Sequence, residues 1–266
     1  QHRLKNGLRV VLAEDHSRPV ANLQICYHVG SRDERPGRTG FAHLFEHLMF
    51  RGSKNVGPEE HMRLVREAGG ELNAYTSFDV TVYWETFPSN YLDRMLWLEA
   101  DRMASLDISV ENFTKEREVV KEERRVNYET PPYGRLMEDV LSHTYEVYPY
   151  KHPPIGSMED IDAAAVEDVR QFHATYYRPN NATLVLVGDF DSREALALIE
   201  KRFGGIPAGA PPPRVEAEEP ERKAPREVRV RYPNAPLAAV VTSYLLPPVS
   251  HPDRHALEIA AAILSN

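Results

Sequence analysis

The stretch Gly40-Phe-Ala-His-Leu-Phe-Glu-His-Leu-Met-Phe50 places two histidines and a glutamate within an otherwise apolar run. Residues four apart share one face of an α-helix, so His43 and His47 can present two imidazoles to a single metal ion. Glu46 stands one turn after His43 and can reach a water at that metal without binding the ion. A fully exposed helix would not carry so many apolar residues, and buried polar groups need partners. The pattern therefore predicts a partly buried metal-binding helix.

The order of the polar residues, H-x-x-E-H, is the inverted form of the helix motif found in zinc peptidases. A catalytic zinc takes three protein ligands and a water, so two histidines leave the site one ligand short. The single cysteine, Cys26, falls in an apolar strand-like run, which favours a carboxylate as the third ligand. Residues 110–128 contain neither Pro nor Gly and predict a long helix rich in glutamate.

That predicted helix offers several carboxylates. Glu116 and Glu123 are seven residues apart and share one helical stripe, whereas Glu122 points about 100° away. A helix so rich in charge is most often solvated, so the residues by themselves leave the choice among these glutamates open.

Segments along nearly the whole chain are similar, in order and spacing, to the pitrilysin/insulinase family of zinc peptidases, and in particular to mitochondrial processing peptidases and their bacterial relatives. In that family the third zinc ligand is a glutamate at the same spacing from the second histidine as Glu123 has from His47. The matching segments are Leu4-Lys-Asn-Gly-Leu-Arg-Val10, Gly30-Ser-Arg-Asp-Glu34, residues 37–53 with the H-x-x-E-H motif, Gly69-Gly-Glu-Leu-Asn-Ala-Tyr-Thr-Ser77, Asp79-Val-Thr-Val-Tyr83 and Glu116-Arg-Glu-Val-Val-Lys-Glu-Glu123.

The resemblance implies a role for each polar residue of the site. His43, His47 and Glu123 are expected to bind one Zn²⁺ per chain. Glu46 is expected to act as the general base, and Glu116 to support the site from behind the ligands. Together these roles imply a zinc-dependent endopeptidase.

The segment Asn73-Ala-Tyr-Thr76 resembles the family strand that pairs with the backbone of the substrate, which binds as an added β-strand. The resemblance implies that Asn73 bonds the peptide near the scissile bond. It also implies that the backbone of Ala74 and Tyr75 forms the ladder. Taken alone, the same residues are equally typical of a solvated edge strand.

Hydrophobic periodicity predicts an α+β fold. The resemblance implies a mixed, mostly antiparallel sheet with helices on one face. Alternating or β-branched runs predict strands at residues 8–14, 22–29, 71–77, 80–87 and 182–187. Helical periodicity and composition predict helices at residues 40–51, 58–68, 91–105, 110–128, 133–144, 166–177 and 192–203.

Composition divides the chain into three parts. Residues 1–208 are predicted to form the zinc-bearing peptidase domain, and residues 209–226, which include Pro211-Pro-Pro213, a Pro-rich linker. Residues 227–266 predict two strands, at 227–232 and 238–246, and a helix that begins near residue 252. So few elements cannot form an independent core, and we interpret them as the incomplete beginning of a second, homologous domain. A second domain or subunit of this kind is expected to complete the cleft around the peptide.

Bulk properties exclude several classes of protein. A net charge of −8 gives no indication of nucleic-acid binding. No apolar run approaches the ~20 residues of a membrane span, and no secretory segment opens the chain. The single cysteine rules out an intrachain disulfide and is compatible with a cytoplasm and equally with a periplasm, so one of these two bacterial compartments is the expected location.

One alternative function stays open at this point. The chain could be a non-catalytic scaffold or partner subunit of the same family, although the complete motif disfavours this. His251 and His255 are four residues apart, but Pro252 places His251 at or before a helix start, so we interpret the pair as a cap and a surface residue. Seven other histidines show no partner at ligand spacing; they are His2, His16, His28, His61, His143, His152 and His173.

Overall fold

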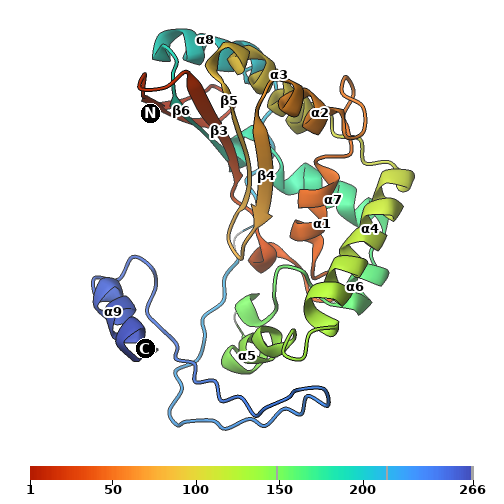
Figure 1. Ribbon diagram of the computed structural model, residues 1–266, viewed down its shortest axis with the longest axis vertical. Coiled ribbons are helices and arrows are strands. Elements are labelled where there is room, and N and C mark those ends of the chain that lie inside the picture. The colour runs from red at the N-terminus through yellow and green to blue at the C-terminus, as the bar shows by residue number, and fades with distance from the viewer. Residues whose placement is uncertain (148, 214, 265–266) are drawn as a thin grey trace.

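A six-stranded sheet forms the centre of the computed structural model, which describes residues 1–147, 149–213 and 215–264 (Figure 1). The strand order is β1-β2-β6-β3-β5-β4. The β2–β6 pair is parallel, and the other pairs are antiparallel. The strands are β1 (His2–Arg3), β2 (Arg9–Glu14), β3 (Val20–Tyr27), β4 (Glu71–Thr76), β5 (Thr81–Pro88) and β6 (Ala182–Gly188). This confirms the predicted α+β fold with a mostly antiparallel sheet.

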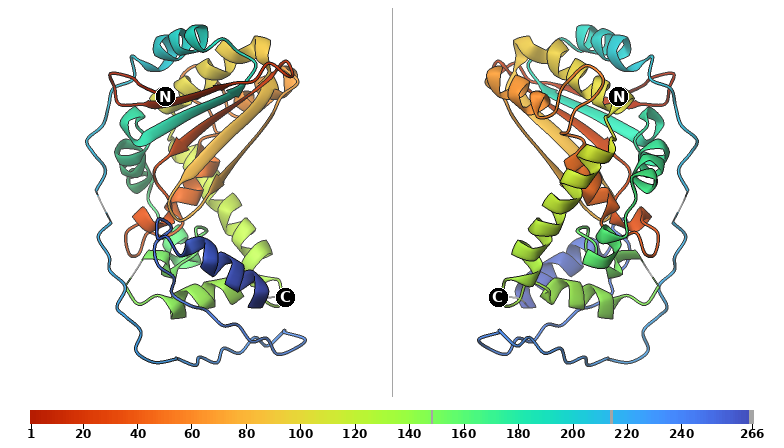
Figure 2. Two further views of the ribbon diagram at one scale, coloured as in Figure 1. Left: turned by 90° about the vertical axis from the view of Figure 1, so that its left-hand side faces the viewer. Right: turned by 90° about the vertical axis from the view of Figure 1, so that its right-hand side faces the viewer.

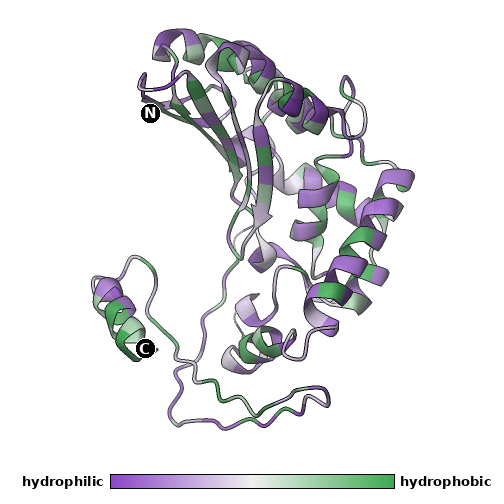
Figure 3. Ribbon diagram, in the orientation of Figure 1, coloured by the Kyte–Doolittle hydropathy of each residue, from purple (hydrophilic) through white to green (hydrophobic). Residues whose placement is uncertain are grey.

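Strand β3 shows why the sheet buries one face. Its buried residues Ala21, Leu23, Ile25 and Tyr27 alternate with more exposed residues that include Asn22. Successive side chains of a strand point to opposite faces, so this alternation commits one face to the core. Figure 3 shows hydrophobic colour along β3.

Helices cover the sheet and extend beyond it. They are α1 (Phe41–Leu48), α2 (Glu60–Glu67), α3 (Leu92–Ser105), α4 (Val110–Arg124), α5 (Leu136–Thr144), α6 (Met158–Asp162), α7 (Val166–Tyr176), α8 (Ser192–Phe203) and α9 (Arg254–Leu264). Helix α1 contacts both β4 and α4, so it lies between the edge of the sheet and a second helix. Among the described residues, no helix has the length and apolar character needed to cross a membrane.

The chain after α8 departs from the prediction. It runs extended along the outside of the molecule (Figure 2), and residues 215–253 include no strand. The strands predicted at 227–232 and 238–246 are therefore wrong for this structure. A strand requires a hydrogen-bonding neighbour, and here the side chains and carbonyls of the segment bond to the α5 region instead. Tyr133, for example, donates to the carbonyl of Leu237 at 2.6 Å.

Helix α9 agrees with the helix predicted near residue 252. Residues 265–266 lie outside the described residues. The division of the chain at residues 208 and 226 stays a prediction.

A buried ionic cluster fixes α2 and α3 against β5. His61 of α2 contacts Glu85 of β5, and Arg102 of α3 holds Glu99 with two hydrogen bonds. All four side chains are buried, and ligand atoms of His61, Glu85 and Glu99 lie within 4.8 Å of one another. The sequence-based expectation that His61 has no partner at ligand spacing is therefore wrong, because its partners come from distant parts of the chain.

Candidate metal centre

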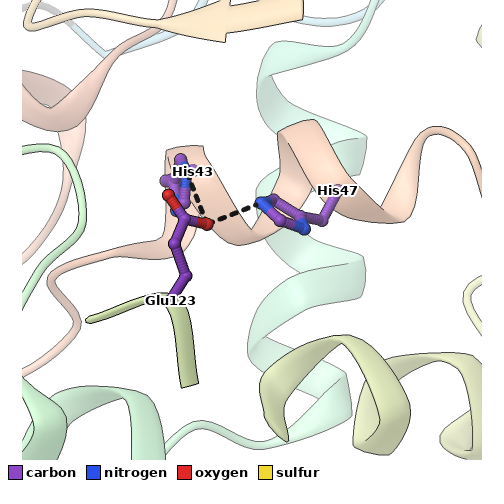
Figure 4. A group of neighbouring side chains, drawn as sticks. All are labelled: His43, His47 and Glu123. Carbon is purple, nitrogen blue, oxygen red and sulfur yellow. Dashed lines mark ion pairs between the residues drawn. The ribbon is translucent and has the colours of Figure 1, made fainter. Parts of the chain in front are cut away.

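Three side chains from two helices converge beside the sheet edge (Figure 4). His43 and His47 project from α1, and Glu123 projects from the last turn of α4. Oε2 of Glu123 lies 3.7 Å from Nε2 of His43 and 3.3 Å from Nε2 of His47. One ligand atom from each residue falls within 4.8 Å of the other two. The structure thus brings together the three residues that the sequence analysis expected to bind metal.

The donor set and its spacing fit zinc. Zinc bonded to nitrogen and oxygen at about 2.0–2.1 Å with tetrahedral angles places neighbouring donors about 3.3–3.4 Å apart. The two donor separations given above lie close to that value. Two imidazoles and one carboxylate also match the ligand types of catalytic zinc sites, which keep a fourth position for water.

The start of α1 is held by a buried carboxylate. The Glu34 side chain is fully buried, and it accepts hydrogen bonds from the backbone N–H groups of Gly40 at 3.0 Å and Ala42 at 2.8 Å. These N–H groups have no partner within the helix, so Glu34 acts as its cap. Gly40 has a φ of 90°, and a Cβ there would lie 2.7 Å from the carbonyl oxygen of Ile155. Both features fix the direction in which α1 presents its histidines.

Glu116 supports His47 from the side opposite Glu123. Its carboxylate lies 3.3 Å from Nδ1 of His47 and also accepts a hydrogen bond from Arg51. A carboxylate on the second ring nitrogen fixes the orientation of a metal-binding histidine. His43 differs, because its buried Nδ1 has no hydrogen-bond partner among the described residues. The packing of α1 therefore determines the position of that ring.

The two histidines have opposite protonation tendencies. Burial, reinforced by His47, lowers the pKa of His43 to about 4, so its imidazole is neutral. Burial also disfavours charge on His47, but the carboxylates of Glu116 and Glu123 outweigh it and raise the pKa of His47 to about 9. A metal binds only the neutral imidazole, so metal binding at this centre displaces the proton of His47.

Glu46 lies on α1 between the two histidines in sequence and is bonded to the sheet. Its Oε2 accepts a hydrogen bond of 2.7 Å from the hydroxyl of Thr76, the last residue of β4. Burial raises the pKa of the Glu46 carboxyl, and the bond from Thr76 opposes that shift. A carboxyl with a raised pKa beside a metal centre is suited to accept and return a proton.

A cavity of about 390 Å³ opens onto the centre. Besides His43, Thr76 and Glu123, its lining includes Asn127 and Tyr128, which the sequence analysis did not single out. Both belong to a π-helical turn that directly follows α4, at Arg125–Glu129. Such turns are frequent at functional sites. No local signal marks this one, because these five residues contain neither Pro nor Gly.

The predicted substrate-binding residues lie on β4, the last strand of the sheet. Asn73 and Tyr75 are exposed, whereas Ala74 and Thr76 are partly buried on the opposite face of the strand. The Asn73 side chain accepts a hydrogen bond of 2.9 Å from the backbone N–H of Ala74. The role of Asn73, Ala74 and Tyr75 in binding a peptide stays a prediction.

Comparison with known families agrees with this geometry. Residues 9–157 match the model described as "Insulinase (Peptidase family M16)", and residues 164–266 match "Peptidase M16 inactive domain". The chain belongs to the M16 family of peptidases.

Individual M16 proteins match along nearly all of the chain. Zinc protease PqqE of Helicobacter pylori is 36% identical over 98% of this chain and 60% of the relative. Human cytochrome b-c1 complex subunit 1 is 28% identical over 99% of this chain and 54% of the relative. The crystal structure of a protease from Helicobacter pylori superposes with a TM-score of 0.80 at 37% identity, covering 82% of this chain and 53% of the other. The chain therefore spans little more than half the length of these M16 proteins.

Proposed function

We propose that this chain is the zinc-bearing half of an M16 endopeptidase, with one zinc bound by His43, His47 and Glu123. The observation that carries the proposal is the convergence of these three side chains. Glu46 lies on α1, the helix that carries the two histidines. The names of relatives such as zinc protease PqqE support the same chemistry.

The chemistry follows from the residue types. A zinc ion held by the three ligands would polarise a peptide carbonyl and lower the pKa of a water beside it. Glu46 takes the proton of the attacking water and then delivers it to the leaving amine. Glu116 contacts Nδ1 of His47 and keeps that ring oriented. Glu123 contacts the other ring nitrogen, Nε2.

The peptide binds, in this proposal, as an additional strand on β4. Because β4 ends the sheet order, its outer edge can pair with an extended chain through backbone hydrogen bonds. That edge consists of Asn73, Ala74 and Tyr75. The next residue, Thr76, lines the cavity together with His43 and Glu123. Such binding demands little of the substrate's sequence, so peptides and unfolded segments are the expected substrate class.

A second M16 unit completes the cleft in this proposal. The residues that would bind zinc and transfer the proton all lie before residue 124, and in this proposal they supply one side of the cleft only. This chain covers 60% of zinc protease PqqE and 53% of the crystallised Helicobacter pylori protease, which supports a second unit in the same polypeptide or in a partner.

The alternative function is that of a non-catalytic subunit. The similarity to cytochrome b-c1 complex subunit 1 is the observation that favours it. The presence of Glu46 and of three converging ligands favours the peptidase, because a scaffold has no need of either.

The test combines metal content with peptide cleavage. The protein, dialysed against zinc and assayed with its second M16 unit, should hold one zinc per chain and cleave a quenched fluorescent peptide. His47→Ala should lose both the zinc and the cleavage, whereas His255→Ala, a change on the exposed helix α9, should lose neither. Full zinc stoichiometry in His47→Ala would refute the assignment of the centre.

A further inference from the structure

Thr76 connects the strand proposed to bind the peptide with the glutamate proposed to act as base. It is the last residue of β4, and its side chain lies on the partly buried face of that strand, toward α1. Its hydroxyl oxygen is 2.7 Å from Oε2 of Glu46 and 3.5 Å from the carbonyl oxygen of Ala42. Both of these oxygens belong to the metal-binding helix.

The two distances decide where the hydroxyl proton lies. A hydroxyl has one proton to donate, and 2.7 Å is a normal length for an O–H···O bond, whereas 3.5 Å is well beyond it. Bonds to an ionised carboxylate are also stronger than bonds to a neutral carbonyl. Thr76 therefore donates to Glu46, and the Ala42 carbonyl is only a neighbour.

The bond restricts an otherwise adjustable side chain. Glu46 is partly exposed, and a glutamate side chain has three rotatable bonds, so without a partner it could adopt several positions near the cavity. A donor on a β-strand removes that freedom, because the strand is itself fixed by its pairing with β5, where Thr76 lies opposite Thr81. One carboxylate oxygen is then held by the sheet, and the other stays available for a proton.

We propose that Thr76 is a positioning residue that sets the location of the Glu46 carboxylate from the strand on which the peptide binds. A peptide paired with β4 is placed along the strand in steps of about 3.3 Å per residue, so its carbonyl groups have fixed positions relative to Thr76. The same strand thus fixes both the bond to be cleaved and the base. This inference rests on the proposed function, because it assumes that Glu46 acts as the base.

The first test is kinetic. Thr76→Val keeps the shape and the β-branched side chain suited to a strand but removes the donor. We expect kcat to fall about 10- to 100-fold, a part of the roughly 10²–10⁴-fold that a positioned general base contributes, while KM and zinc content stay unchanged. Thr76→Ser restores the hydroxyl and should recover most of kcat. Thr114→Val, at an exposed position on α4 where the hydroxyl bonds to its own helix, is the matched control and should change nothing.

The second test needs no turnover. A peptide hydroxamate binds a catalytic zinc and donates a hydrogen bond to the neighbouring base, so its affinity reports the position of Glu46. In the zinc-loaded protein, Thr76→Val should weaken hydroxamate binding by about tenfold. In a Glu46→Gln background the same change should weaken it less than twofold, because the carboxylate that Thr76 positions is already gone.

The outcomes separate this inference from the proposed function. Equal effects of Thr76→Val in both backgrounds, or a kcat that Thr76→Ser does not recover, would overturn the role of Thr76 even if the protein cleaves peptides. Strong coupling between Thr76 and Glu46 in a zinc-loaded protein that cleaves no peptide would sustain the positioning role and contradict the proposed function.

Discussion

Glu116 illustrates how a single buried charge can serve a site by contacting one of its proposed ligands, His47, without itself being a ligand of the metal. Its side chain is 3% exposed, and its carboxylate lies between His47 and Arg51. Without Arg51 and His47 a carboxylate so deeply buried would be unpaired and costly. The contacts with His47 and Arg51 that offset the cost of burying Glu116 are therefore the same contacts that hold it beside the metal centre.

The corresponding prediction concerns metal affinity. Glu116→Gln keeps the size of the side chain but weakens its hold on Nδ1 of His47, so zinc affinity should fall about 10- to 100-fold. Titration with a competing chelator measures this directly. Glu111→Gln is the control, because Glu111 lies exposed in the first turn of the same helix and pairs with Lys115. Equal affinities for Glu116→Gln and wild type would contradict the role of Glu116.

Site residues that lie close together in the sequence could be predicted from it, whereas those that only the fold brings together could not. His43, Glu46 and His47 lie within one helical segment, so periodicity alone places their side chains. Only the family resemblance points to Glu123, since no periodic rule connects residues on separate helices. The sequence places Thr76 in a predicted strand but indicates no role for it, because its bond to Glu46 depends on how β4 packs against α1.

Helix α1 is the element on which the centre depends, and its cap should matter for metal as well as for stability. Glu34→Ala leaves the N–H groups of Gly40 and Ala42 without their acceptor in a buried place. We expect a loss of about 1–2 kcal/mol in the free energy of unfolding, together with weaker zinc binding. Denaturant unfolding and zinc titration measure the two effects.

A matched control separates the cap from general destabilisation. Asp191 caps α8 by accepting from the N–H groups of Arg193 and Glu194, far from the metal ligands in sequence and on a different helix. Asp191→Ala should lower stability and leave zinc affinity unchanged. If both variants weaken zinc binding equally, the effect belongs to overall stability and not to the orientation of α1.

The junction of α2, α3 and β5 should make stability depend on pH. Burial raises the pKa of Glu85 to about 7, and also that of Glu99, although Arg102 opposes both shifts. A carboxyl whose pKa is raised on folding contributes stability below its unfolded pKa, and this contribution is lost as pH rises through its folded pKa. Burial lowers the pKa of His61 to about 3, so between about pH 3 and 6.5 this histidine makes stability rise with pH and offsets part of the loss from the two glutamates.

We therefore expect the thermal midpoint to fall between about pH 4.5 and 7, where the unfolded chain has lost the protons that folded Glu85 and Glu99 still hold, and most steeply above about pH 6.5, where His61 no longer offsets the loss. Glu85→Gln removes one of these titrating groups, so its midpoint should vary less across the window. Differential scanning calorimetry of both proteins at each pH measures this. A wild-type midpoint that is constant or rises across the window would contradict the expectation.

Helices and strands with a clear hydrophobic period were predicted well. Elements whose formation depends on contacts with another segment were not. Alternation placed β3, β4 and β5, and helical periodicity placed α1 through α5 apart from their ends. The π-helical turn at Arg125–Glu129 was absorbed into a predicted helix, because composition does not distinguish the two. The two strands predicted after residue 226 do not form here, since β-propensity alone does not supply a neighbouring strand.

The whole molecule should depend on a second M16 unit for activity. The metal centre lies within the described chain, whereas enclosing the peptide requires an opposing wall. Removing one donor to the transition state typically costs ~10²–10³ in rate, so supplying the missing wall should raise activity by at least that factor. Titrating the second unit into residues 1–266 while monitoring cleavage and zinc content measures the gain. Equal specific activity with and without it would refute this expectation.

The most direct test of the zinc-peptidase assignment is the rate of peptide cleavage by zinc-loaded Glu46→Gln, measured with the second unit present. The amide is nearly the same size as the carboxylate but cannot accept the proton of the attacking water. We predict one zinc per chain, as in wild type, and a cleavage rate lower by about 10²–10⁴. A variant that holds its zinc and cleaves at close to the wild-type rate would show that Glu46 is not the base.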